Sequence, residues 1–311
     1  MNPSNHDPLV TIIILNWNGL QDTLACLGSL ASIEYSHYQV VVVDNGSHDG
    51  SIAAIRQAFP TVVLLENEQN LGFVGGNNQG IDYALEQGAD YVLLLNNDTE
   101  VAPDFLRRLV EVAELDPSIG MVGPTVYFYA EPDRIWSAGG RIDWNWGNTS
   151  MIGLNDLDQG QYGVTPRPVD FITGCALFVR TDLVRQIGAL DPRFFAYFEE
   201  TEWCVRAARA GYQIRHIPKA RVCHKISVDA REASPQVHYY MIRNRLLFLK
   251  LTQAGWKPWF NTIFREFVPR LVSWTVKPKW RYKAPQRGAM IRAMIDFSLG
   301  RFGKVDTAKP S

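Results

Sequence analysis

The sequence predicts an α/β protein built around a doubly wound, mostly parallel sheet. Four short apolar runs, rich in branched side chains and bounded by polar residues, are typical of strands buried on both faces. A segment of helical length separates most of these runs, which favours parallel strands joined by right-handed crossovers. Clusters of Asn, Asp and Gly follow three of the runs, where open α/β sheets bind ligands. The predicted strands are residues 9–15, 39–43, 62–65 and 91–95.

The segments around these strands predict the other elements. Residues 70–80 contain many Gly and Asn residues and are expected to form a loop. Residues 127–168, rich in aromatic, Gly, Asn and Asp residues, are expected to be irregular, with short antiparallel strands over the sheet's edge. An apolar run at 170–180 predicts a strand that contains Gly174. Helices are predicted at 20–32, 51–59, 79–87 and 103–115, strands at 121–126 and 213–222, and an amphipathic helix with a leading aromatic segment within 194–209.

Three polar turns should meet at one edge of the sheet. They are residues 16–19, 44–50 and 96–99, and each follows a predicted parallel strand. Neither a G-x-G-x-x-G nor a G-x-x-x-x-G-K motif is present, which argues against a dinucleotide site and a P-loop. Asp98 supplies the hard oxygen that Mg²⁺ or Mn²⁺ prefers, so the turns predict a metal-diphosphate site. The alternative is that residues 97–99 form only a turn and the start of a helix.

Composition limits the classes that need considering. The net charge of −1 hides a split of roughly −13 for residues 1–240 and +12 for residues 241–311, which suggests an anionic partner for the basic end. The N-terminus lacks the pattern of a signal peptide, and no apolar run is long enough to span a membrane. The four cysteines lack metal-site spacing, so we expect buried thiols in a cytoplasmic protein.

Seven segments, taken together, resemble the family 2 glycosyltransferases, in particular bacterial rhamnosyltransferase-like members that build surface polysaccharides. The resemblance covers about residues 9–250 and implies the GT-A fold, with a nucleotide-diphosphate sugar lying across the sheet edge described above. The segments, in chain order, are VTIIILNWNG, VVVDNGSHDGS, NLGFVGGNNQGI, LLLNNDTEV, GCALFVR, GALDPRFFAYFEETEWCVRAARAGY and YYMIRNRLLF.

This resemblance implies roles for particular residues in binding the donor. Asp44 matches the acidic residue that hydrogen-bonds the base of the donor, and Asp98 matches the last position of the D-x-D motif, which binds the divalent cation. The first carboxylate of that motif is replaced by Asn96. His224 is similar in position to a histidine that approaches the metal or the diphosphate. The other expected donor-binding positions are Asn16, Asn45, Gly72, Gly76, Asn78, Asn97, Gly174 and Arg243, the last as a partner of the diphosphate.

The same resemblance implies the catalytic base. The family's E-D motif falls on Glu199 and Glu200, and the acceptor hydroxyl is expected to meet Glu200. A carboxylate that accepts the hydroxyl proton allows a single displacement with inversion at the anomeric carbon. Here Glu stands where Asp is commoner. By themselves, acidic residues at the start of a helix are often explained by the helix dipole alone.

The chain is expected to divide into a catalytic domain, residues 1–240, and a basic, aromatic-rich helical extension, residues 241–311. We expect residues 9–125 to bind the nucleotide and 126–240 to hold the acceptor and the base. The extension suits the inner face of an anionic membrane. Its alternatives are a helix pair packed on the catalytic domain and a contact within a homo-oligomer, and no recognition motif indicates nucleic acid.

The predicted activity is an inverting, metal-dependent transfer of a sugar from a nucleotide-diphosphate donor to a hydroxyl of a glycan or polyprenyl-linked acceptor. Family similarity favours a dTDP-sugar as donor, with L-rhamnose as the first choice. One alternative is a relative that binds carbohydrate or scaffolds a membrane complex without catalysis. The other is a sugar nucleotidyltransferase, which the absence of a basic glycine-rich loop after the first strand disfavours.

Overall fold

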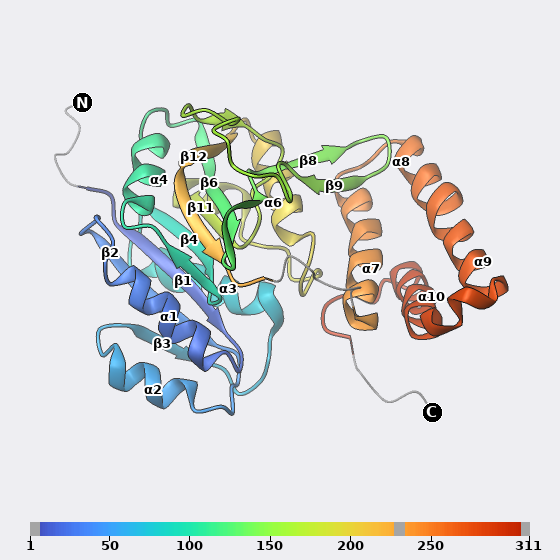
Figure 1. Ribbon diagram of the computed structural model, residues 1–311, viewed down its shortest axis with the longest axis horizontal. Coiled ribbons are helices and arrows are strands. Elements are labelled where there is room, and N and C mark those ends of the chain that lie inside the picture. Colours follow the sequence, from blue (N-terminus) through green and yellow to red (C-terminus); the bar gives the residue numbers. More distant parts are fainter. Residues whose placement is uncertain (1–6, 227–233, 306–311) are drawn as a thin grey trace.

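A computed structural model describes residues 7–226 and 234–305. Three stretches lie outside the described residues: the start of the N-terminal segment, residues 227–233 and the end of the predicted extension. A ten-stranded sheet forms the centre, and its main path runs β10-β12-β6-β11-β4-β1-β2-β3 (Figure 1). The predicted parallel strands are present: β1 pairs in parallel with β2 and β4, and β2 with β3. Their bounds are β1 (Val10–Asn16), β2 (Tyr38–Asp44), β3 (Val63–Glu66) and β4 (Tyr91–Asn96).

The other half of the sheet is mixed, as expected. β11 (Ala176–Arg180) lies between β4 and β6 (Ile119–Phe128) and is antiparallel to both, whereas β12 (Gln213–His224) is parallel to β6. Short antiparallel strands make up much of the predicted irregular region. They are β7 (Glu131–Ser137), β8 (Gly140–Asp143), β9 (Asn148–Met151) and β10 (Arg167–Pro168), with β5 (Thr99–Val101) paired to β12.

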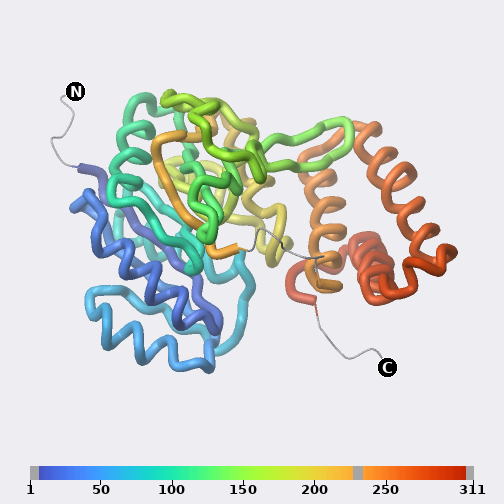
Figure 2. The backbone as a smooth tube through the Cα atoms, viewed as in Figure 1, coloured from blue at the N-terminus to red at the C-terminus, as the bar shows by residue number. Residues whose placement is uncertain are grey.

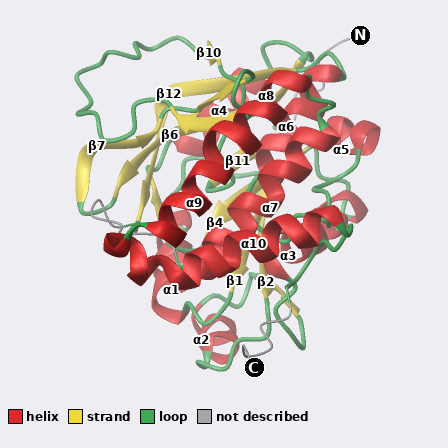
Figure 3. Cartoon of the chain, turned by 90° about the vertical axis from the view of Figure 1, so that its right-hand side faces the viewer, coloured by secondary structure: helices red, strands yellow, loops and turns green. Residues whose placement is uncertain are grey.

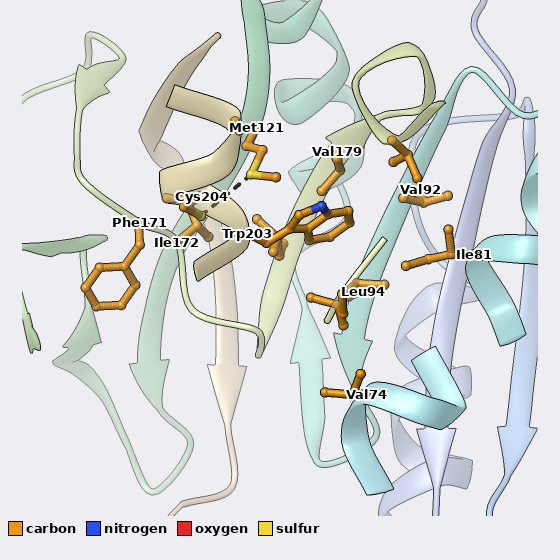
Figure 4. Packing of buried hydrophobic residues seen from close by; sticks show 14 of the residues in the cluster. Val74, Ile81, Val92, Leu94, Met121, Phe171, Ile172, Val179, Trp203 and Cys204 are labelled. Carbon is orange, nitrogen blue, oxygen red and sulfur yellow. Dashed lines mark hydrogen bonds between the residues drawn. The ribbon is translucent and has the colours of Figure 1, made fainter. Parts of the chain in front are cut away.

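Helices cover both faces of this sheet because its strands are apolar on both faces. Alternate residues of β1 enter two different cores, Ile13 on one side and Ile12 with Ile14 on the other. Figure 4 shows the first core, where Trp203 and Val74 from two helices lie against strand residues. The helices of this half are α1 (Leu20–Leu30), α2 (Ser51–Ala58), α3 (Gly72–Glu86), α4 (Phe105–Ala113), α5 (Thr181–Ile187) and α6 (Glu199–Arg209).

A helical layer follows the mixed half of the sheet. Figure 2 shows residues 256–298 at one end of the molecule, away from β1–β3. α10 packs against α7, and the side chains of Leu247, Phe248 and Leu249 on α7 belong to the main core. The elements are α7 (Pro235–Leu251), α8 (Trp256–Phe260), the π-helix η1 (Asn261–Phe267), α9 (Val268–Val276), the 3₁₀ helix η2 (Pro278–Lys283) and α10 (Ala284–Ser298). In the described part of the chain, none of the helices is long and apolar enough to cross a bilayer.

Several expected boundaries were wrong. The loop expected at 70–80 is mostly helix, because α3 begins at Gly72. The strand expected at 170–180 begins only at Ala176, which leaves Gly174 in a turn. The expected division at 240/241 falls inside α7, whose side chains join the core of the catalytic half. In each case tertiary packing overrode the local signal, which came from Gly and Asn at 70–80, from the apolar run at 170–180 and from charge at 240/241.

Candidate active site

The three polar turns lie together at the carboxyl ends of β1, β2 and β4, as the parallel topology predicts. The side-chain amide of Asn16 donates to Asp44 Oδ1 over 2.7 Å. The Asn97 amide donates to Thr23 Oγ1 over 2.9 Å and reaches Asn16 Oδ1 at 3.4 Å. Each turn therefore contributes a side chain to one hydrogen-bonded network.

Asp44 lies at the centre of this network and has no exposed surface. Its Oδ1 accepts from Asn16, and its Oδ2 accepts from the backbone N–H of Ser47 over 2.8 Å. Each oxygen can accept a further bond, but because Asp44 has no exposed surface, a direct bond to the base of a donor, which the resemblance implies, would require its neighbours to move. In this structure Asp44 ties the first two turns together.

Asn45 and Asn78, both expected to bind donor, are also engaged within the chain. Asn45 Nδ2 donates to the carbonyl of Gly72 over 3.1 Å, and its Oδ1 accepts from Asn67. Asn78 bonds both backbone groups of Leu190, at 2.8 Å and 3.1 Å. We therefore correct the expectation for Asn78, because its amide is used to hold the segment that follows α5.

The glycines of α3 are explained by packing. A Cβ on Gly72, whose φ is +79°, would overlap the ring of Phe195. A Cβ on Gly76 would overlap Cδ1 of Leu15 on β1. Both glycines are buried and allow close packing of α3 against the sheet and against the segment before α6; the donor-binding role expected for them stays a prediction.

Asp98 and His224 face each other, which brings together the two residues expected to hold the metal. Asp98 Oδ1 and His224 Nε2 are 3.0 Å apart. Burial alone would raise the pKa of Asp98, but His224 outweighs burial and the pKa is lowered. Burial alone would lower the pKa of His224, but Cys175 and Asp98 raise it to about 10. Without a competing cation, the imidazole is therefore protonated and paired with the carboxylate at neutral pH.

Glu199 and Glu200 begin α6 in a low-dielectric environment. Burial and the neighbouring Glu200 raise the pKa of Glu199 well above its usual value. Burial also raises the pKa of Glu200, to about 7. The third acid of this turn, Glu202, is different, because both of its oxygens accept from Nε of Arg206 at 2.8–2.9 Å. A carboxylate that titrates near neutral pH is suited to general-base catalysis.

Gly174 and Cys175 lie between the two carboxylate groups. The position of a Cβ on Gly174 would be 3.9 Å from Glu200 Cβ and 3.0 Å from the ring of Phe73. Cys175 is close enough to His224 to raise the pKa of the imidazole. This turn thus connects the start of α6 to the Asp98–His224 pair.

The four titratable residues described above, namely Asp98, His224, Glu199 and Glu200, share a feature that the network of turns lacks. Each carries a buried atom for which the described part of the chain offers no hydrogen-bond partner. Buried polar atoms are nearly always satisfied in native proteins, so such a group calls for a ligand or an ion. The atoms are Asp98 Oδ1, Glu199 Oε2, Glu200 Oε2 and His224 Nδ1. Asp98 Oδ1 forms an ion pair with His224 at 3.0 Å but makes no hydrogen bond to a described residue.

The segment that leads into α6 is strained. Phe195, Tyr197 and Phe198 all have φ between 68° and 73°, a region that non-glycine residues rarely occupy. Asn244 on α7 holds the segment, since its Nδ2 lies 2.7–2.9 Å from the carbonyls of residues 194, 196 and 197. These bonds fix the backbone from which Glu199 and Glu200 project.

Arg243, expected to pair with the diphosphate, also holds this segment. It is 1% exposed, and its guanidinium donates to side-chain oxygens of Tyr239 and Asn244 and to three backbone carbonyls. All of its N–H groups are thereby used, so the expected diphosphate contact is corrected to a positioning role. The carbonyls belong to Arg193, Phe194 and Gly303.

Sequence reasoning missed three features of the site. The positioning role of Asn244 had no local signal, because its partners lie some fifty residues away. The contact of Cys175 with His224 likewise depends on the pairing of distant strands. Trp17 could have been found, since it directly follows Asn16 in the first turn, and it is 58% exposed at the edge of the sheet.

Comparisons with known proteins identify the family. A search with family models matches residues 11–188, more than half of the chain, to Glycosyl transferase family 2. The N-acetylglucosaminyl-diphospho-decaprenol L-rhamnosyltransferase of Mycobacterium tuberculosis is 26% identical over 74% of this chain and 80% of its own length. The dTDP-rhamnosyl transferase RfbF of Shigella flexneri is 23% identical over 76% of this chain and 79% of its own length.

Solved structures support the fold. The crystal structure of GalNAc-T7 with UDP, GalNAc and Mn²⁺ superimposes with a TM-score of 0.69 at 15% sequence identity. The match covers 95% of this chain and 58% of the longer one, so this chain spans less than two thirds of that protein. The GT-A architecture expected from the sequence is therefore confirmed. With this fold, the polar sheet edge and the match of the family model, the chain belongs to glycosyl transferase family 2.

Proposed function

We propose that this glycosyltransferase moves a sugar, with inversion, from a nucleotide diphosphate to a hydroxyl group of a glycan or lipid-linked acceptor. The observation that carries the proposal is that, among the described residues, buried oxygens of Glu199 and Glu200 make no hydrogen bond, and that Asp98 Oδ1 faces only the imidazole of His224. Gly174 lies close to Glu200, and the next residue, Cys175, interacts with His224, the partner of Asp98. A site of this kind can hold a diphosphate on one side and an incoming hydroxyl on the other.

Glu200 is the proposed base. It accepts the proton of the acceptor hydroxyl while that oxygen forms a bond to the anomeric carbon and the bond from this carbon to the diphosphate breaks. A pKa raised to about 7 gives Glu200 a higher proton affinity than an ordinary carboxylate and still leaves it largely ionised at slightly alkaline pH. Glu199, buried beside it, has a pKa raised well above its usual value by burial and by Glu200, so Glu200 is the member of the pair that ionises first.

The chain's residues fit a divalent cation in part. Asp98 Oδ1 and the imidazole of His224 are suitable ligands for Mg²⁺ or Mn²⁺, and the oxygen is buried without a hydrogen-bond partner. Among the described residues no group of three potential ligands occurs, so the diphosphate and water would complete the coordination shell. When bound, the ion would offset the charge that develops on the leaving diphosphate. The Mn²⁺ in the structure of GalNAc-T7 supports this proposal.

For the donor we propose a dTDP-sugar, and for the sugar L-rhamnose. Two similar proteins are named as rhamnosyltransferases, and one of these names includes dTDP. The name of the mycobacterial relative supports a polyprenyl-diphosphate acceptor. The exposed ring of Trp17, next to the network around Asp44, offers a stacking surface for the base. The four cysteines are free thiols, which supports a cytoplasmic location.

A panel of nucleotide sugars tests the donor. We expect dTDP-L-rhamnose with Mn²⁺ to raise the melting temperature more than UDP- or GDP-sugars do, because binding to the folded state stabilises it. Slow release of dTDP should follow. Stabilisation without release of any nucleoside diphosphate, with or without acceptor, would favour a non-catalytic binding protein. Formation of a nucleotide sugar from dTTP and a sugar phosphate would identify a nucleotidyltransferase instead.

A further inference from the structure

The C-terminal helices carry a row of exposed apolar side chains. α8, η1 and α9 follow one another without a break from Trp256 to Val276. Every fourth residue along this segment is apolar and between 39% and 71% exposed. We call these residues the apolar stripe: Trp256, Phe260, Phe264, Val268, Val272 and Val276.

The π-helix in the middle keeps the stripe on one face. A step of four residues overshoots one turn of an α-helix, which has about 3.6 residues, so a four-residue repeat drifts around the helix. η1 is wider, and the same step falls short of one of its turns. The two drifts have opposite signs and largely offset each other. In Figure 3, which looks onto this end of the molecule, α8 and α9 lie in front, together with α10.

The surroundings of the stripe are strongly basic. Residues 256–305 contain eleven Lys and Arg residues against two acids, Glu266 and Asp296. Both acids are already paired: Glu266 with Arg245 and Arg270, and Asp296 with Arg301 at 3.6 Å among its partners. The cations in this range are Lys257, Arg265, Arg270, Lys277, Lys279, Arg281, Lys283, Arg287, Arg292, Arg301 and Lys304.

We propose that the apolar stripe docks this protein on the surface of an anionic lipid bilayer. An apolar helix face flanked by Lys and Arg suits such a surface, because the aromatic rings enter the acyl boundary while the cations meet anionic headgroups. A second copy of this chain on the same face would bring two basic surfaces together. Nucleic acid would satisfy the cations but leaves Val268, Val272 and Val276 without an apolar partner.

A cavity lies behind the stripe, between the C-terminal helices and the residue that precedes α6. It has a volume of about 290 Å³ and lies between the Arg245–Glu266–Arg270 ion pairs and Phe198, the residue before Glu199. Met241 and Phe267 are among its apolar lining residues. Docking through the stripe would bring the cavity close to the bilayer. This last step rests on the proposed function, because a cavity close to the bilayer is relevant only if the acceptor is linked to a lipid.

Vesicle flotation tests the proposal on the full chain. The wild type should float with vesicles of phosphatidylcholine and phosphatidylglycerol, and much less with phosphatidylcholine alone. Trp256→Ser with Phe260→Ser and Phe264→Ser should weaken binding about 100-fold, because three exposed rings no longer enter the bilayer. Lys277→Gln with Lys279→Gln should weaken it about tenfold at low salt.

The matched control replaces the same number of exposed apolar residues elsewhere, with Leu115→Ser, Leu157→Ser and Val164→Ser. This variant should float like the wild type. Equal binding to both kinds of vesicle, or equal binding by the stripe variant, would overturn the proposal. So would sedimentation of the wild type as a dimer that the stripe substitutions dissociate, or preferential binding to an oligonucleotide.

The release of nucleoside diphosphate from the donor, measured without vesicles, separates this inference from the proposed function. The stripe variant should keep the wild-type rate, since none of its substitutions touches the site. A protein that floats but releases no nucleoside diphosphate would refute the proposed function and leave the docking surface standing.

Discussion

Two polar clusters lie at the same edge of the sheet, and they differ in whether their polar atoms have hydrogen-bond partners. Around Asn16, Asp44 and Asn45 the side-chain oxygens and amides bond to each other and to backbone groups. Around Asp98 and Glu200, buried oxygens have no hydrogen-bond partner in the described chain. Family resemblance assigned the first cluster to the donor, Asp98 to the metal and Glu200 to the catalytic base. Their hydrogen bonds indicate that the first is mainly scaffold and the second is the place where a ligand completes the structure.

The largest expected effect comes from Glu200→Gln. The amide cannot accept the hydroxyl proton, so kcat should fall by about 10²- to 10⁴-fold, with little change in donor affinity. The matched control is Glu202→Gln on the same helix, where Arg206 already uses the carboxylate, so folding stability should fall more than kcat does. Steady-state kinetics and calorimetric binding distinguish the two. Near-normal turnover of the Glu200 variant would place the base elsewhere.

Asp98→Asn should weaken donor binding by about 100-fold, but only in the presence of Mn²⁺, because the lost carboxylate is the proposed ligand. Titration calorimetry with and without the ion measures this difference. Asn16→Ala provides the contrast in the scaffold cluster. It should lower the free energy of unfolding by about 1–3 kcal/mol, since it removes a buried partner of Asp44, and it should leave the response to Mn²⁺ intact. A Mn²⁺ effect of wild-type size in the Asp98 variant would refute the assignment.

Asn244→Ala tests whether the strained segment positions the catalytic helix. Loss of three bonds to backbone carbonyls should cost about 1–3 kcal/mol of stability in urea unfolding. If the segment relaxes, kcat should also fall by about tenfold while KM for the donor stays constant. Asn261→Ala is the control, because its amide makes a single exposed bond to the carbonyl of Asn145. A stability loss with unchanged kcat would make Asn244 purely structural.

The last expected effect, and the smallest per unit of the quantity varied, is on the pH dependence of stability. The pKa of Glu200 is about 7 in the folded protein and about 4.5 in the unfolded chain, so the folded state binds more protons between these values. Stability should therefore fall as the pH rises from 4.5 to 7, by up to about 1.4 kcal/mol per unit. Over the same range kcat should increase, because the base becomes ionised. Glu200→Gln should flatten this part of the stability curve; an unchanged curve would contradict the raised pKa.

Much of the fold was predictable because its signals are local. The apolar runs of β1, β2 and β4 have no alternation, and a strand of this kind has to be buried on both faces. The parallel order then brought Asn16, Asp44 and Asn97 together without knowledge of any contact. Glycine was the main source of error. In the segment from Gly72 to Gly80 it permits close packing of a helix, whereas the sequence pattern favoured a loop.

By itself the sequence determined which strands are buried, which turns share an edge and where carboxylates gather, because these follow from periodicity and chain direction. Only the tertiary structure decided which of these polar groups are already satisfied. Arg243 was predicted to bind diphosphate and instead bonds the backbone before α6, while Asp98 and Glu200 keep oxygens without partners. The difference arises because hydrogen-bond partners come from segments tens of residues away, whose approach depends on how helices and strands pack.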